Sequence, residues 1–200
     1  SIDSLVDAQY YFSKLINTQS KYAATAQYYS AYIAYQNGLY ETALNGFRHL
    51  ISNEQFGSII PYYITQIYFF QRSYKQLIAF ASPLSETVIP SRKAEVNRLL
   101  AEAYYRTEDF ENSIIHFTAY VEQVDQVKPI VNFLLGQSFF KVGEFENAIN
   151  YLEKASISAD SISQHATYCL GVSYLKVQQF NYALQAFKKS ASYSYDEVIQ

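Results

Sequence analysis

Residues 134–152 read LLGQSFFKVGEFENAINYL, and residues 169–187 read CLGVSYLKVQQFNYALQAF. In both stretches a glycine is followed three residues later by an aromatic residue, six residues after that by a second aromatic residue, and three further on by an alanine. The two glycines, Gly136 and Gly171, are 35 residues apart. A pattern that returns at a fixed period of this length predicts a stack of similar structural units.

The same pattern occurs three more times, with more divergence, earlier in the chain. Its five copies begin at residues 31, 65, 101, 136 and 171, so the intervals are 34, 36, 35 and 35 residues. Five copies in phase indicate a repeat rather than a coincidence. In chain order the copies are Ala31, Ala34, Tyr40, Ala43, Phe47; Thr65, Tyr68, Tyr74, Leu77, Ala81; Ala101, Tyr104, Phe110, Ser113, Phe117; Gly136, Phe139, Phe145, Ala148, Leu152; and Gly171, Tyr174, Phe180, Ala183, Phe187.

Each copy is predicted to form a helix, a turn and a second helix. The 200 residues include four prolines and six glycines, and no segment alternates between apolar and polar residues as a half-buried strand would. In the turns QNGLY and VGEFE, Gly38 and Gly143 suit the left-handed cap that ends many helices. Small residues let paired helices approach closely, and aromatic residues fill the remaining space. We therefore expect the rings of Phe145 and Phe180 to be buried, so that replacing either by alanine costs roughly 3 to 5 kcal/mol.

This pattern resembles the tetratricopeptide repeat (TPR), in which a small residue marks the close contact of two helices and an alanine marks the crossing on the second helix. The resemblance covers nearly the whole chain. It implies an all-α fold: a right-handed α-α superhelix, or TPR solenoid, of about five helix pairs with a partial repeat at each end. The chain departs from the family in lacking most closing prolines and the aromatic residue near the start of each first helix, where it has Gln27, Pro61, Asn97, Asn132 and Thr167.

We predict one solenoid over residues 1–200. Residues 1–20 are expected to form the second helix of a truncated repeat, and residues 196–200 to begin a further one. Neither end resembles the polar capping repeat that a solenoid needs for solubility, which predicts that the chain is a fragment of a longer array. The five complete repeats are expected at residues 21–57, 58–93, 94–128, 129–163 and 164–195.

Composition disfavours several classes of protein. The formal charge is −3 and the 15 basic residues are scattered, so no positive stripe is expected to bind nucleic acid. The most apolar segment, residues 58–70, is interrupted by Pro61, Thr65 and Gln66, so no membrane span is expected in this chain. Cys169 is the single cysteine and cannot form an internal disulfide, which fits the cytosol or a periplasm.

No catalytic or metal-binding constellation is expected. His165 and Cys169 lie four residues apart and could form two metal ligands or a nucleophile with its base. No second cysteine is present, however, and His49 and His116 fall on predicted second helices of other repeats. We therefore predict no enzyme activity, no metal and no cofactor.

The TPR resemblance implies that the first helix of each pair lines a concave surface, with exposed positions three and four residues apart. Tyrosine there supplies a large rigid contact area with a polar tip, as peptide and carbohydrate sites use. The alternative, that these rings form the core between repeats, is left open by the sequence. The candidate ligand-binding residues are Tyr28, Tyr32, Tyr35, Tyr62, Phe69, Arg98, Glu102, Tyr105, Arg106, Gln137 and Lys141.

The leading functional hypothesis is a scaffold that binds a peptide or a partner helix in this aromatic-rich groove. A clamp for the carboxylate of a chaperone tail is not expected, because Tyr28, Tyr32 and Tyr62 occupy positions that would need positive charge. Two alternatives are a carbohydrate-binding groove and a structural spacer that associates weakly with itself, end to end.

The strings YYSAYIAYQNGLYETAL and IPYYITQIYF resemble segments of the long multi-repeat TPR proteins of Gram-negative bacteria. That resemblance implies a periplasmic location and a role in assembling an envelope complex, with a cytoplasmic location left open.

Overall fold

A computed structural model describes residues 10–16, 18–158 and 160–195. Within these ranges the chain forms helices joined by turns and contains no strand. It divides into two compact units, Ser1–Leu99 and Leu100–Gln200. The repeat start predicted at residues 196–200 lies outside the described residues, as do residues 1–9 and 17 of the helix predicted over residues 1–20.

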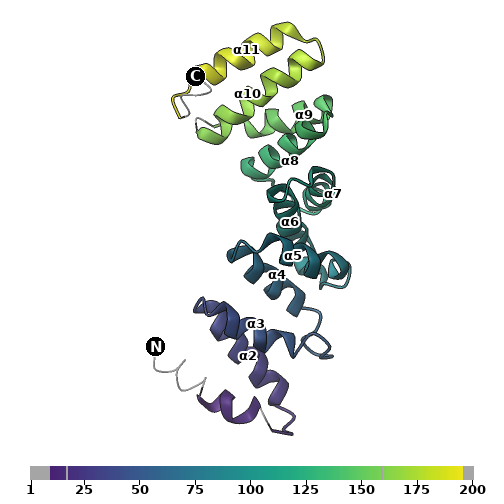
Figure 1. The fold of residues 1–200 in the computed structure, drawn as a ribbon, viewed down its shortest axis with the longest axis vertical. Helices are drawn as coiled ribbons and strands as arrows, with labels where there is room; N and C mark the ends of the chain where they lie inside the picture. Colours follow the sequence, from purple (N-terminus) through teal and green to yellow (C-terminus); the bar gives the residue numbers. More distant parts are fainter. Residues whose placement is uncertain (1–9, 17, 159, 196–200) are drawn as a thin grey trace. The chain divides into compact units, whose positions relative to one another are not determined.

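The first unit contains two consecutive helix pairs. Helix α2 packs against α3, and α4 against α5 (Figure 1). Helix α3 also contacts α4, which joins the two pairs. Residues 10–16 are helical and precede these pairs. The bounds are α2 (Ala23–Gln36), α3 (Tyr40–Arg48), α4 (Ile60–Phe70), α5 (Tyr74–Ala81), the 3-10 turn η1 (Ser82–Leu84) and α6 (Pro90–Arg106), which begins in the first unit and ends in the second.

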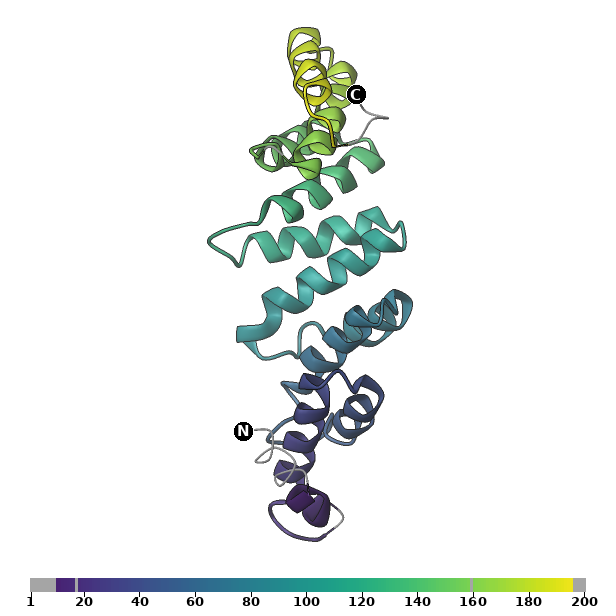
Figure 2. The same cartoon turned by 90° about the vertical axis from the view of Figure 1, so that its left-hand side faces the viewer.

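The second unit repeats the arrangement. Helices α7 and α8 lie side by side and are joined by the loop of residues 122–128 (Figure 2). Helix α8 packs against α9, and α10 against α11. Helix α10 also contacts α8 and α9, so the α8–α9 pair is covered by the next pair. The bounds are α7 (Phe110–Val121), α8 (Pro129–Val142), α9 (Phe145–Ala155), α10 (Ser161–Lys176) and α11 (Phe180–Ala191).

The same turn joins α2 to α3, α4 to α5, α6 to α7, α8 to α9 and α10 to α11. One residue in each turn has a positive φ, between 55° and 84°. The next residue donates its N–H to the carbonyl five residues earlier at 2.8–2.9 Å, as in a Schellman motif. The positive-φ residues are Gly38, Arg72, Glu108, Gly143 and Gln178. The prediction of left-handed caps at Gly38 and Gly143 is confirmed. Arg72, Glu108 and Gln178 adopt the same left-handed backbone although each carries a Cβ atom.

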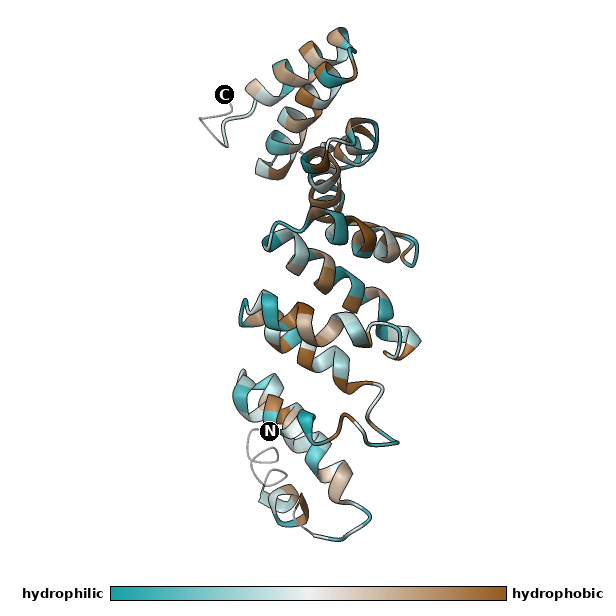
Figure 3. Ribbon diagram, turned by 45° about the vertical axis from the view of Figure 1, so that its right-hand side comes forward, coloured by the Kyte–Doolittle hydropathy of each residue, from teal (hydrophilic) through white to brown (hydrophobic). Residues whose placement is uncertain are grey.

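The helices of a pair cross at small residues, as predicted. A Cβ atom added to Gly136 would lie 2.9 Å from Cγ and 3.0 Å from the backbone nitrogen of Leu152 on α9. A Cβ atom at Gly171 would lie 2.7 Å from the ring of Phe187 on α11. Ala148 is fully buried at the α8–α9 crossing. Apolar residues are concentrated on the helices, and many hydrophilic residues lie in the connecting turns (Figure 3).

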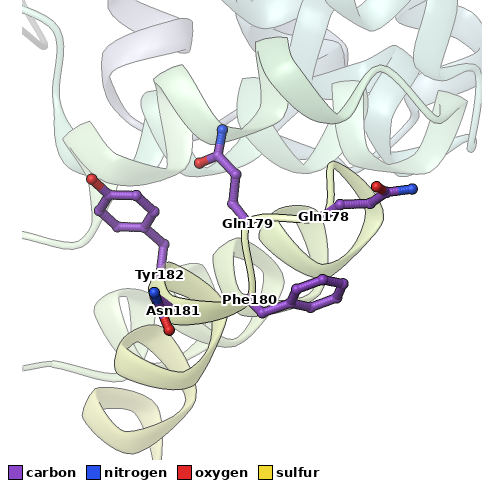
Figure 4. Close-up of a pocket in the computed structure, with 5 residues that line it drawn as sticks. All are labelled: Gln178, Gln179, Phe180, Asn181 and Tyr182. Atoms are coloured by element: carbon purple, nitrogen blue, oxygen red, sulfur yellow. The ribbon is translucent and has the colours of Figure 1, made fainter.

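The expectation that Phe180 is buried was wrong. Phe180 is the first residue of α11 and is 64% exposed. Figure 4 shows its ring directed away from the neighbouring helices, on the side of the turn opposite Tyr182. Phe145, its counterpart on α9, is only half-buried, against Phe140 at 5.9 Å. The first position of a second helix therefore lies at the rim of the core, and the loss of 3 to 5 kcal/mol expected for a buried ring does not apply to Phe180.

Among the described residues, no helix combines the length and the apolar character that crossing a bilayer requires.

The turn geometry can be tested by a pair of substitutions. Gly143→Ala should lower the unfolding free energy by about 1 kcal/mol, because the left-handed backbone at φ 84° disfavours a Cβ atom. Strain is the expected cause, since no atom lies within 4 Å of the added Cβ. Gln178→Gly should have the opposite effect, relieving up to about 1 kcal/mol. Urea denaturation of both variants and the parent measures these changes, and equal stability of all three would contradict the shared turn.

Candidate ligand-binding face on the first helices

The predicted site residues all lie on first helices, but in two groups. Those in the first unit come from α2, α4 and the part of α6 up to Leu99, and those in the second unit come from the rest of α6 and from α8. The first group is Tyr28, Tyr32, Tyr35, Tyr62, Phe69 and Arg98, and the second is Glu102, Tyr105, Arg106, Gln137 and Lys141. Arg106 and Lys141 are exposed, and the other nine residues are half-buried.

Four of the predicted tyrosines surround a fifth that was not predicted, Tyr63 on α4. Its ring centroid lies 6.2, 5.7, 5.5 and 5.2 Å from those of Tyr28, Tyr32, Tyr35 and Tyr62, and the ring planes are inclined by 62–71° in an edge-to-face arrangement. Edge-to-face pairs of this kind contribute about 0.5–1.5 kcal/mol each. We call Tyr28, Tyr32, Tyr35, Tyr62 and Tyr63 the aromatic cluster.

Tyr63 fixes the aromatic cluster to the core of the first unit. It is 9% exposed and stacks on the fully buried Phe47 of α3 at 5.1 Å. The repeat register, two residues before the small residue Thr65, indicates its burial only in part, because the equivalent Tyr29 of the first copy is 46% exposed. The same position holds Leu99 and Leu134 in the next two copies, and both are buried. The other cluster members are half-buried, so their rings both pack and retain exposed surface.

Hydrogen bonds fix the orientation of the rings. The hydroxyl groups of Tyr28 and Tyr63 lie 3.2 Å apart, within hydrogen-bond distance. The Tyr35 hydroxyl donates to Oε1 of Gln66 at 2.8 Å, and the Gln66 side chain also hydrogen-bonds Tyr62. Gln66 therefore connects two cluster members across α2 and α4.

Three members of the aromatic cluster, Tyr35, Tyr62 and Tyr63, have a raised pKa. Burial raises the pKa of Tyr35 to about 12, and the neighbouring tyrosines add to the effect. Burial, followed by the hydrogen bond with Tyr28, also raises the pKa of Tyr63. For Tyr62, burial raises the pKa while the Arg92 guanidinium, 4.8 Å from the ring centroid, opposes the rise. These three hydroxyl groups therefore keep their protons to a higher pH than a free tyrosine does.

Phe69 and Arg98 form a second contact in the first unit. The Arg98 guanidinium lies 5.8 Å from the Phe69 ring centroid, within cation–π range. Arg98 also forms a salt bridge with Glu95 at 2.7 Å. Its charge is therefore held against neighbouring side chains, which makes Arg98 a weaker candidate for ligand contact than the tyrosines.

The second unit contains a related polar contact. The Tyr105 hydroxyl donates a hydrogen bond to Oε1 of Gln137 on α8. Its repeat positions match those of Tyr35 and Gln66: a tyrosine four residues after a small residue bonds a glutamine one residue after the next small residue. This Tyr–Gln contact recurs between successive first helices. Its two residues are 31 or 32 positions apart in the sequence, so no local sequence pattern predicts it.

Cys169 and His165 show no arrangement typical of nucleophilic or metal chemistry. Cys169 is 7% exposed, and burial raises the pKa of its thiol, opposed by a hydrogen bond with Gln137 and by the charge of Lys141. A raised thiol pKa disfavours the reactive thiolate. His165 lies beside Phe133, with ring centroids 6.5 Å apart. Across the described ranges, no three His, Cys, Asp or Glu residues gather as metal ligands would.

The paired helices, the repeated turn and the small-residue crossings define a TPR solenoid, and solved structures with the same fold match this chain. YrrB, described as a TPR protein with an unusual peptide-binding site, superposes with a TM-score of 0.72 at 18% identity, over 94% of each chain. MamA of AMB-1 superposes with a TM-score of 0.69 at 15% identity, over 86% of this chain and 92% of the MamA chain. MamA from Desulfovibrio magneticus RS-1, residues 41 to the end, superposes with a TM-score of 0.64 at 12% identity, over 87% of this chain and 96% of the MamA chain.

Neither a scan against protein-family models nor a search of the curated proteins finds a match to this sequence. At identities of 12 to 18%, the structural matches establish the fold of the chain and leave its ligand to be inferred from its own residues.

The raised pKa of Tyr35 predicts a loss of stability at high pH. The unfolded chain releases this proton near pH 10, whereas the folded chain holds it to about pH 12, so the contribution is present below pH 10 and is lost as the pH rises from 10 to 12. Tyr35→Phe should therefore reduce the fall in unfolding free energy over this range. The exposed Tyr22→Phe serves as control and should keep the slope of the parent. Identical slopes for all three proteins, measured by urea denaturation at several pH values, would contradict the burial of the Tyr35 hydroxyl.

Proposed function

We propose that this chain is a non-catalytic protein-interaction scaffold that holds a peptide or partner helix against α2 and α4. The aromatic cluster is the main contact surface. The observation that carries the proposal is the state of these rings: four are half-buried, and all are ordered by contacts with the buried Tyr63.

Pre-ordered tyrosines suit protein recognition for two reasons. Rings already held by neighbours lose little conformational freedom on binding, which lowers the entropy cost of association. Tyrosine also combines an apolar ring with a hydrogen-bonding tip, and it is enriched among the residues that dominate binding energy at protein interfaces. The peptide-binding site named for YrrB, a protein of the same fold, supports this class of ligand.

The hydrogen bonds of the cluster favour a protein ligand over a carbohydrate. A sugar is recognised largely through hydrogen bonds to its hydroxyl groups, and the hydroxyls of Tyr28 and Tyr35 are already engaged with Tyr63 and Gln66. A peptide or helix can instead use the exposed parts of the rings through apolar contact.

Two further parts of the proposal rest on narrower grounds. Weak self-association is supported by exposed apolar residues in each unit, including Leu39 at 54% and Leu184 at 55%. A periplasmic location and a role in assembling an envelope complex rest on the resemblance of the tyrosine-rich segments to long bacterial TPR arrays.

Affinity capture from a native cell extract tests the proposal, with the full-length protein as bait. A Tyr32→Ala, Tyr62→Ala variant should recover the main partners at on the order of one-tenth of the parental yield, because it removes two half-buried contact rings while leaving Tyr63 in place. The control is Tyr11→Ala with Tyr22→Ala, which removes two exposed tyrosines outside the cluster. Quantitative mass spectrometry compares the yields, and circular dichroism checks that each variant is folded. If both double variants retain the partners equally, the cluster serves packing and not binding.

A further inference from the structure

Three exposed cations recur at one position of the repeat in the second unit. Arg106, Lys141 and Lys176 each lie five residues after the small residue of the third, fourth and fifth copies, and they are 35 residues apart. Each lies in the last turn of a first helix: α6, α8 or α10. All three side chains are exposed. We call these residues the cation row.

Side-chain contacts place the cation row along one face of the first helices. The hydrogen bond from Tyr105 to Gln137 joins the end of α6 to α8, and the hydrogen bond between Gln137 and Cys169 joins α8 to α10. Lys141 is four residues after Gln137 and therefore lies on the same face of α8, one turn further on. The charge of Arg106 acts on the Tyr105 hydroxyl, and that of Lys141 acts on the Cys169 thiol.

Among the described residues, no acidic side chain is paired with a cation of the row. None of the three forms a salt bridge within the described residues. Acidic residues in the adjoining turns instead accept hydrogen bonds from the first turns of the second helices. Asp109 accepts the backbone N–H of Asn112 at the start of α7, and Glu144 accepts a hydrogen bond from the Asn147 amide at the start of α9.

Stabilisation of helix ends does not account for the row. Cations in the last turn of a helix do interact favourably with its dipole. The first helices of the first unit, however, have Gln36 and Phe70 at the same repeat position, and neither α2 nor α4 has a basic residue in its last turn. The fold therefore forms these helix ends without a cation. The residue before each cation is apolar or aromatic: Tyr105, Phe140 or Leu175.

We infer that the cation row binds an extended acidic segment of a protein partner. Packed helices lie about 8–10 Å apart, and an extended or polyproline-type chain advances about 3.1–3.4 Å per residue, so three residues span one repeat. A segment with a carboxylate at every third residue therefore matches the row. In a polyproline-type helix of three residues per turn, these carboxylates also share one face. The inference rests on the proposed function, and it names the chemistry of the partner segment that the second unit takes.

The test uses a synthetic probe, a fluorescein-labelled peptide of five Glu-Ala-Ser triplets, with fluorescence anisotropy on the full-length protein. The triple variant Arg106→Ala, Lys141→Ala, Lys176→Ala should weaken binding on the order of tenfold, because it removes three exposed ion pairs of modest strength. The matched control is Lys128→Ala, Lys154→Ala, Lys188→Ala, which removes three exposed cations of the second unit outside the row. The control should stay within about twofold of the parent, since long-range effects of exposed charges are screened by salt. Circular dichroism confirms that both variants are helical.

A second probe tests the spacing. It has the same composition, but its glutamates stand at every second residue, so they cannot all meet the row, and it should bind about threefold more weakly or worse. The inference is overturned if the two probes bind equally, if the control variant weakens binding as much as the row variant, or if the first probe shows no binding at millimolar concentration. It is also overturned if a single-stranded oligouridylate binds more tightly than the peptide and depends on the row, because the ligand would then be a nucleic acid.

Failure of this inference can be separated from failure of the proposed function. The Tyr32→Ala, Tyr62→Ala variant changes only the first unit and should bind the acidic probe with the affinity of the parent. The two proposals separate if the Tyr32→Ala, Tyr62→Ala variant loses the captured partners while the row variant binds the acidic probe as tightly as the parent. The aromatic cluster then remains the binding surface, and the cation row is rejected as a binding site.

Discussion

The close crossing of two helices at a small residue is the constraint on which the structure depends. At Gly136 and Gly171 even a methyl group would meet the partner helix within 3 Å. This approach sets where each second helix begins, and so which face of the first helix remains uncovered. Because one pair alone cannot bury its apolar surface, the next pair must cover it, as α10 covers both α8 and α9. The aromatic cluster and the cation row both lie on first helices, at positions that the crossing leaves available.

The repeat could be predicted from the sequence because its small and aromatic residues recur in phase, but the turns could be predicted only in part. Gly38 and Gly143 indicate a left-handed cap by their residue type, whereas Arg72, Glu108 and Gln178 adopt the same backbone through the surrounding hydrogen bonds. No residue preference reveals them. The burial of Phe180 was wrongly predicted, because a recurring spacing shows only that positions in different repeats are structurally equivalent. The exposure of each ring depends on which residues cover it.

The candidate site shows a similar division. Helical spacing placed Tyr28, Tyr32, Tyr35 and Tyr62 on first helices, and the structure brings their rings together around Tyr63. Whether they pack or bind could not be decided from spacing, because a half-buried ring packs on one side and leaves the other side available for a ligand. The contacts of Tyr35 with Gln66 and of Tyr105 with Gln137 join residues more than 30 positions apart, so only a three-dimensional structure reveals them. The cation row, by contrast, is visible in the sequence once the repeat register is known.

Backbone amide hydrogen exchange on the full-length protein, with and without a captured partner, tests most directly whether the first helices form the working face. Partner binding should slow exchange mainly in the first helices α2, α4, α6, α8 and α10 and in the turns that follow them. Protection confined to the second helices α3, α5, α7, α9 and α11, with the first helices unchanged, would contradict the assignment and place the binding surface on the opposite side of the helix pairs.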